Sequence, residues 1–153
     1  MSATEFTTSP VEIVDVQPRI AAVVRKRVAM ADMSDAQHRA RLALEAALKN
    51  ADIAPLGPNL TVWRMPEGGS IDYAPGVFIA NPLEGAGDVS TITLPEGRAA
   101  HLRLIGSYAG LPEAWSRLFK GCEGHVLSGV NWEIYTASDG AAEVNTDLYA
   151  LLA

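Results

Sequence analysis

The chain has 153 residues, of which 48% are hydrophobic and 20% charged, and its formal net charge is −6. This length and composition predict one globular domain with a sizeable core. The acidic balance argues against general nucleic-acid binding, which needs clustered Lys and Arg, and no apolar run reaches the roughly 20 residues of a membrane span. The single cysteine, Cys122, excludes an internal disulfide and a cysteine-built metal site.

The N-terminal segment is rich in Ser and Thr and lacks the basic and apolar blocks of a signal peptide. We therefore expect a disordered leader over residues 1–9, a folded domain over residues 10–153 and a cytoplasmic location. The one basic run, Arg25-Lys26-Arg27, ends a strand-like segment, so we interpret it as a solvated strand end.

The first half is predicted to contain four strands and one helix. In chain order these are strand 11–16, strand 19–28, helix 35–50, strand 60–65 and strand 71–80. Ser34 and Gln37 have the spacing of a capping box, which predicts the start of the helix. Pro75 and Gly76 indicate a bulge or an edge position in the last strand.

The second half is predicted to contain four strands and a shorter helix. In chain order these are strand 89–94, strand 98–104, a helix that begins near Pro112, strand 131–137 and strand 143–152. Trp115, Leu118, Phe119 and Cys122 fall at positions i, i+3, i+4 and i+7, so we expect this stripe to face the core.

The two halves, 10–83 and 88–152, repeat one order: strand, helix, strand, strand. This internal repeat predicts an α+β fold, with one antiparallel sheet, both helices on one face and a ligand cleft on the other. The repeat matches Thr61 with Glu133 and Trp63 with Tyr135. We expect the cleft to use residues of both halves.

Glu133 and Tyr135 lie two residues apart in a predicted strand, so they point to the same face. Trp132 and Ile134 point to the other face, which we expect to be core. A carboxylate beside aromatic rings suits a pocket for flat, positively charged organic molecules. The alternative is a solvated Glu on an open sheet face.

Other aromatic residues are candidates to line this pocket. The predicted ligand-binding residues are Glu133, Tyr135, Trp63, Tyr108, Thr61, Tyr73 and Phe78. Trp63 and Tyr135 could instead be cross-strand packing residues, and Tyr108 could only anchor the second helix. The facing of Tyr73 and Phe78 stays open across the expected bulge.

The sequence indicates no metal site or cofactor. His38, His101 and His125 have no metal-binding spacing, and no Walker, GxSxG or GxGxxG pattern stands in the right context. Cys122 has no evident activating neighbour, so we do not expect a nucleophile.

Five segments in this order and spacing are similar to GyrI-like small-molecule-binding domains, also called AraC-type effector-binding or gyrase-inhibitory-like domains. The segments are 11–14 with 19–23, Gly-Pro at 57–58 followed by 62–63, 94–100, Gly-x-Tyr at 106–108 with the following helix, and Glu-x-Tyr within 132–135. The resemblance covers residues from about 10 to 152.

This resemblance implies that Glu133 sits at the bottom of an aromatic pocket for cationic, lipophilic ligands, as in multidrug binding, with Tyr135 and Tyr108 as walls. Trp63 stands where the family usually has a Tyr, so a larger ring should reshape the site. Family members often carry a DNA-binding helix-turn-helix, which this sequence does not predict. We expect Glu133 to have a raised pKa in the empty protein.

Three functions remain open. The leading one is a stand-alone binder of small molecules that sequesters them or presents them to a partner such as a transcription regulator. The second is a hydrolase, because some proteins of the family that this sequence resembles hydrolyse cyclopropane-bearing DNA alkylators. In such an enzyme Glu133 would activate water, and Tyr135 or Tyr108 would donate a proton to the leaving group. The third is a protein-interaction module that inhibits gyrase.

Overall fold

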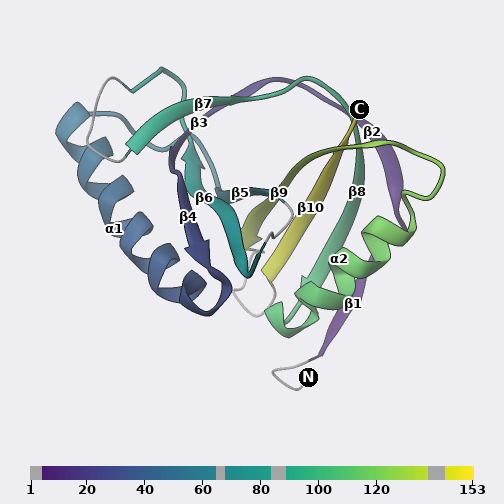
Figure 1. The fold of residues 1–153 in the computed structure, drawn as a ribbon. Helices are drawn as coiled ribbons and strands as arrows, with labels where there is room; N and C mark the ends of the chain where they lie inside the picture. The colour runs from purple at the N-terminus through teal and green to yellow at the C-terminus, as the bar shows by residue number, and fades with distance from the viewer. Residues whose placement is uncertain (1–4, 65–67, 84–88, 138–143) are drawn as a thin grey trace. The chain divides into compact units, whose positions relative to one another are not determined.

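The computed structural model describes residues 5–64, 68–83, 89–137 and 144–153. The chain divides into two compact units, an N-terminal unit of residues 17–95 and a C-terminal unit of residues 1–16 and 96–153. Strands pair antiparallel within each unit, and each unit carries one α-helix (Figure 1). The predicted α+β class is therefore confirmed.

The described residues of the N-terminal unit form five strands, of which β6 is the central one. Its elements are β3 (Arg19–Val24), β4 (Lys26–Ala29), the 3-10 helix η1 (Met30–Asp32), α1 (Met33–Ala51), β5 (Asn59–Arg64), β6 (Ser70–Phe78) and β7 (Val89–Leu94). The strand order is β5-β6-β3-β7, and β4 continues along β6 beyond the end of β3. The predicted loop at 81–88 lies outside the described residues after position 83.

Helix α1 covers one face of this sheet. Its buried side chains, with the strand residues they pack against, form the core Ala22, Val24, Ala40, Leu44, Ala47, Leu48, Val77, Ile79, Leu83 and Val89. The predicted start was wrong by two residues: Ser34 lies inside the helix and Asp32 occupies the N-cap position without a side-chain bond. The helix ends at Asp52 in the left-handed region (φ 57°), where its amide bonds the carbonyls of Leu48 and Lys49.

The predicted bulge in β6 is absent from the register that the structure describes, and β6 is central rather than an edge strand. Pro75 is tolerated because the β3 ladder reaches β6 only at residues 76–78 and the β4 ladder at 70–73. A residue without an N–H therefore falls where the pairing on that side is interrupted. The regular register puts Tyr73 and Phe78 on opposite faces, since they are an odd number of residues apart.

The C-terminal unit also shows five strands over the part of it that the structure describes. Its elements are β1 (Phe6–Thr8), β2 (Glu12–Val16), β8 (Gly97–Gly106), the 3-10 helix η2 (Tyr108–Gly110), α2 (Leu111–Lys120), β9 (Leu127–Ala137) and β10 (Val144–Leu152). The strand order is β9-β10-β8, and β1 and β2 pair with the other edge of β8. The expected leader is thus partly wrong, since Phe6–Thr8 pairs with β8; residues 1–4 and the predicted turn at 138–140 lie outside the described residues.

The predicted order in each half was strand, helix, strand, strand. In both units the last of these strands lies between two others: β6 lies between β5 and β4, and β10 lies between β8 and β9. The flanking strands differ from the predicted halves. β2 pairs with β8 in the C-terminal unit, and β7 pairs with β3 in the N-terminal unit. The internal sequence repeat itself stays a prediction.

Candidate functional site

Glu133 lies in the middle of β9, opposite Leu148 of β10. The indole Nε1–H of Trp115 on α2 donates to Glu133 Oε1 at 2.6 Å, and the hydroxyl of Tyr135 donates to Glu133 Oε2 at 2.7 Å. Among the described residues each carboxylate oxygen therefore has one donor, and both donors are aromatic side chains. The carboxylate is held by neutral hydrogen bonds.

These bonds correct the expected side of the site. Because Trp115 belongs to α2, Glu133 and Tyr135 point to the face that α2 covers, whereas the sequence placed the cleft on the face away from the helices. The opposite face of β9 carries Trp132, which is 3% exposed and stacks on Tyr149 with 5.4 Å between ring centroids. Both faces of β9 carry buried residues, Asn131 on one and Trp132 on the other, so strand alternation alone did not identify the face beneath the helix.

The environment of Glu133 makes its ionisation less favourable than in water. Burial raises the pKa of Glu133 above the ordinary carboxyl value, and the hydrogen bonds from Tyr135 and Trp115 lower it in part. This is the direction that the sequence predicted. A largely desolvated carboxylate whose hydrogen-bond donors in the described part of the chain are both neutral gains from a positively charged partner.

Tyr108 approaches Tyr135 edge-on, with 6.1 Å between ring centroids and an interplanar angle of 88°. Its side chain is 48% exposed. Desolvation, and then the charge of Glu133, raises the pKa of Tyr108, so its phenol keeps its proton at neutral pH. Tyr108 is thus the solvent-facing member of the aromatic group around Glu133.

The Gly-Ser-Tyr segment places this ring. Gly106 has a φ of 107°, and a Cβ there would lie 2.7 Å from the carbonyl oxygen of Glu5. Only glycine accepts this conformation and this close approach. Ser107 Oγ then accepts a bond from Ala109 N at 3.1 Å and caps η2, which carries Tyr108.

Trp115 is the site residue that sequence reasoning missed, since the helical stripe assigned it to the core. It is 8% exposed and stacks on Phe119 at 5.4 Å, which agrees with a core role for its ring. A buried indole N–H nevertheless needs an acceptor. The need of this N–H for an acceptor was the signal that could have identified Trp115, because the carboxylate of Glu133 on the strand can accept its hydrogen bond.

The predicted residues of the N-terminal unit fall on both faces of its sheet. Thr61 and Trp63 pair with Pro75 and Tyr73 on the α1 face, and the Tyr73 hydroxyl donates to Gln37 Oε1 of α1 at 3.0 Å. Phe78 lies on the other face, buried under the Arg19 guanidinium at 3.5 Å. Tyr73 and Phe78 are therefore both buried within this unit, and a ligand-binding role for them stays a prediction.

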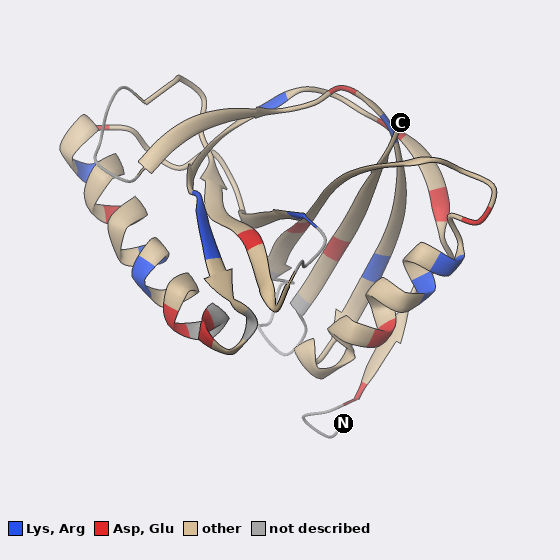
Figure 2. Cartoon of the chain, in the orientation of Figure 1, with Lys and Arg blue, Asp and Glu red and all other residues tan. Residues whose placement is uncertain are grey.

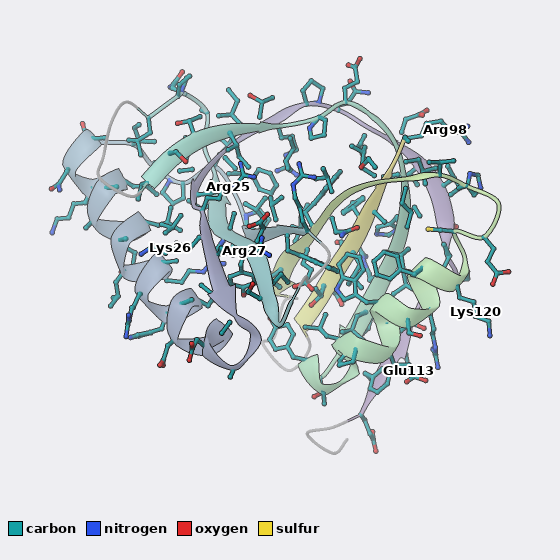
Figure 3. All side chains as sticks on the ribbon, viewed as in Figure 1. Arg25, Lys26, Arg27, Arg98, Glu113 and Lys120 are labelled. Carbon is teal, nitrogen blue, oxygen red and sulfur yellow. The ribbon has the colours of Figure 1, made fainter. Side chains whose placement is uncertain are left out.

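The basic run Arg25-Lys26-Arg27 lies where β3 passes into β4 (Figure 3). Arg27 donates from Nε to Ser70 Oγ at 3.1 Å and pairs with Asp72 at 3.5 Å, both on the neighbouring strand. This supports the interpretation as a solvated strand end. None of the described helices is long and apolar enough to cross a membrane.

A family model for the GyrI-like small molecule binding domain matches residues 9–151. No curated protein matches the chain. Among solved structures, the C-terminal domain of EcmrR gives a TM-score of 0.77 at 15% identity, over 94% of this chain and 96% of that one. EcmrR in a complex with DNA gives 0.78 at 16% identity, over 96% of this chain and 57% of that one.

Two further structures have the same fold. SAV2435 bound to tetraphenylphosphonium gives a TM-score of 0.70 at 12% identity, over 95% of this chain and 94% of that one. A hydrolase from Listeria innocua gives 0.62 at 12% identity, over 94% and 92%. At such identities the likeness shows the fold alone.

Proposed function

The chain belongs to the GyrI-like small-molecule-binding family, and from this premise we propose that its C-terminal unit binds small lipophilic cations with Glu133 as the anion. The observation that carries the proposal is a poorly solvated carboxylate held between two aromatic donors, with a third ring nearby. A cation beside Glu133 would relieve the desolvation that raises its pKa. Aromatic faces would add cation–π attraction.

Two buried polar atoms on the same sheet face add to this argument. Asn131 Nδ2 and Thr146 Oγ1 are buried, and neither has a hydrogen-bond partner within the described part of the chain. Such atoms are rare in native interiors and call for a partner. Asn131 precedes Glu133 by two residues and Thr146 lies opposite Tyr135, so both flank the carboxylate. A ligand with polar atoms beside its charge would satisfy them.

The test uses tetraphenylphosphonium, the cation bound in the SAV2435 structure, and neutral triphenylphosphine oxide as its uncharged counterpart. Glu133→Gln should weaken cation binding by tenfold or more, about 1.4 kcal/mol, and leave the neutral compound unaffected. Glu113→Gln is the matched control, because Glu113 is a half-exposed carboxylate on α2 outside the site (Figure 3). Equal cation affinity in wild type and Glu133→Gln would contradict the proposal.

A hydrolase is the second candidate, favoured by the 2.7 Å contact between the Tyr135 hydroxyl and Glu133. In this mechanism Glu133 takes a proton from water and Tyr135 or Tyr108 donates one to the leaving group. Turnover of a cyclopropane-bearing electrophile that is lost in Glu133→Gln would separate the enzyme from the binder. A gyrase-inhibiting role, a regulator as partner, a pocket shared by both repeats and a cytoplasmic location stay predictions.

A further inference from the structure

Three polar side chains of β9 follow one another on the face that carries the carboxylate: Asn131, Glu133 and Tyr135. Tyr135 donates to Glu133, and Trp115 donates to the same carboxylate. Asn131 is 2% exposed, and its Nδ2 is buried without a hydrogen-bond partner in the part of the chain that the structure describes. One end of this polar row therefore lacks a partner.

The strand beside Asn131 presents apolar side chains to it. Ala150 lies opposite Asn131 on β10 and Leu148 lies opposite Glu133, and both are fully buried. β9 itself is uncharged apart from Glu133, and Figure 2 draws it mostly tan. A side-chain amide nitrogen donates hydrogen bonds and accepts none, so the missing partner is an acceptor. An acceptor on a ligand would recover the free energy that the buried, unpaired donor costs.

The spacing along β9 says where on the ligand this acceptor belongs. Asn131 and Glu133 are two residues apart on an extended strand, so their Cα atoms are about 6.5–7 Å apart. A ligand with its positive centre beside Glu133 meets Asn131 with a group at a similar distance from that centre. A negatively charged acceptor is disfavoured there, because it would lie close to the carboxylate of Glu133.

We propose that the preferred ligands are lipophilic cations with a neutral carbonyl oxygen about 7 Å from the positive centre, and that Asn131 selects them by donating to this oxygen. The assignment rests on the proposed function, since Glu133 holds the cation. Tetraphenylphosphonium carries no acceptor and would leave Asn131 unpaired. A buried polar group discriminates strongly against an analogue that lacks its partner.

The probes are two phosphonium cations of the same shape, titrated into the full chain by calorimetry. (4-Acetylphenyl)triphenylphosphonium carries a ketone oxygen across the ring from phosphorus, and (4-isopropenylphenyl)triphenylphosphonium carries a CH₂ group in its place. Wild type should bind the ketone about tenfold more tightly. Equal affinity for the two cations would overturn the selection by Asn131.

Variants of Asn131 test whether its amide is the donor. Asn131→Leu keeps the branched shape and removes the N–H groups, so the two cations should bind it within twofold of each other. Asn131→Ala, which cannot overpack the site, should lose the preference in the same way. Asn145→Leu is the matched control, because Asn145 precedes Thr146 by one residue and lies on the opposite face of β10, so it should keep the preference.

The stability of the empty protein separates selection from a structural role. A donor that has no partner contributes no hydrogen bond to folding, so Asn131→Leu should not lower the urea midpoint of unfolding. A large fall in that midpoint, together with an unaltered preference for the ketone, would show that Asn131 is a structural residue and would overturn the proposal.

Thr146 is the competing partner for the ketone. It is fully buried, its Oγ1 has no partner among the described residues, and it lies opposite Tyr135, on the other side of Glu133 from Asn131. Thr146→Val removes the hydroxyl at nearly constant shape. Loss of the preference in Thr146→Val but not in Asn131→Leu would overturn the assignment to Asn131.

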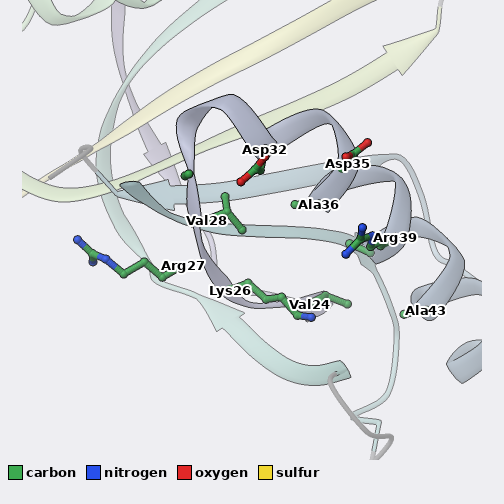
Figure 4. A pocket seen from close by; sticks show the side chains of 11 residues that line it. Val24, Lys26, Arg27, Val28, Asp32, Asp35, Ala36, Arg39 and Ala43 are labelled. Carbon is green, nitrogen blue, oxygen red and sulfur yellow. The ribbon is translucent and has the colours of Figure 1, made fainter. Parts of the chain in front are cut away.

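A hollow of about 670 Å³ in the N-terminal unit is the competing place for the cation, because Asp32 and Asp35 line it (Figure 4). Both residues are exposed, so a cation gains little there over water. Asp35→Asn should therefore leave both affinities as in wild type. Weaker binding in Asp35→Asn with none in Glu133→Gln would overturn the cation site and this inference together. Weaker binding in Glu133→Gln with no preference for the ketone would overturn this inference alone.

Discussion

The indole Nε1 of Trp115 lies 2.6 Å from Glu133 Oε1 and ties α2 to the middle of β9. A helix residue thus stabilises the ionised form of a strand carboxylate whose pKa is raised by burial. The Tyr135 hydroxyl donates a hydrogen bond to the other carboxylate oxygen of Glu133, Oε2.

The first prediction concerns these two donors. Trp115→Phe and Tyr135→Phe should each raise the pKa of Glu133 further, because each removes a hydrogen bond that lowers it. The measurement is a pH titration of the side-chain carboxyl carbon by NMR. Trp132→Phe is the control, since Trp132 stacks on Tyr149 on the opposite face of β9 and should leave the titration unchanged. An unchanged titration in Trp115→Phe would show that the indole does not act on the carboxylate.

Strand and helix positions followed well from the sequence because turn residues and periodicity are local signals. The strand predicted at 89–94 coincides with β7, and the helix near Pro112 is α2. The pairing partners of the strands could not be predicted from the sequence, because they depend on residues far apart in the chain. β1, for example, lies in a Ser/Thr-rich segment and is a strand because it pairs with β8.

The candidate site was predictable only in part. The Glu-x-Tyr spacing located Glu133 and Tyr135 on one face, and the Gly-x-Tyr element located Tyr108. Trp115 was indistinguishable from the other residues of its apolar stripe, because its ring packs like theirs and only its N–H differs. The facing of Tyr73 and Phe78, which the expected bulge left open, follows from the regular register of β6; their ligand-binding role stays a prediction.

The second prediction is the pH dependence of cation binding. Tetraphenylphosphonium carries a permanent charge, so pH changes only the protein. Because burial raises the pKa of Glu133, the carboxylate takes up a proton at higher pH than an exposed Glu does, and affinity should fall by up to about tenfold per pH unit as the pH drops below that pKa. Affinity should rise as pH passes the pKa and then level off. Calorimetric titrations over the acid range check this, and a similar slope in Glu133→Gln would assign the effect to another group.

The third prediction concerns the backbone that positions Tyr108. Gly106→Ala should destabilise the protein by about 1–3 kcal/mol, because its φ is 107° and its Cβ would contact the Glu5 carbonyl. Gly57→Ala is the matched control: a Cβ at Gly57 meets nothing within 4 Å, so its effect should stay within about 0.5 kcal/mol. Urea unfolding measures both. Equal costs would mean that the close approach to Glu5 is not a constraint.

The last prediction uses a polar cluster on the face of the C-terminal sheet away from Glu133. Asp147, 7% exposed, accepts bonds from His101 Nε2 at 2.8 Å and from Arg103 Nε at 2.9 Å and Nη2 at 3.2 Å. Burial works to raise the pKa of Asp147, but the bonds and charges of His101 and Arg103 together outweigh it, so the pKa lies below the ordinary value.

A carboxyl whose pKa falls on folding contributes stability above its unfolded pKa, near roughly 4, and loses that contribution as pH falls through the folded value. Asp147→Asn should therefore lower the free energy of unfolding by about 1–3 kcal/mol at pH 7, and the deficit should shrink below about pH 4. Asp72→Asn, which removes the exposed pair with Arg27, should cost less than about 1 kcal/mol. Urea unfolding from pH 2 to 7 tests both variants, and a deficit in Asp147→Asn that persists unchanged at low pH would reject the ionic contribution.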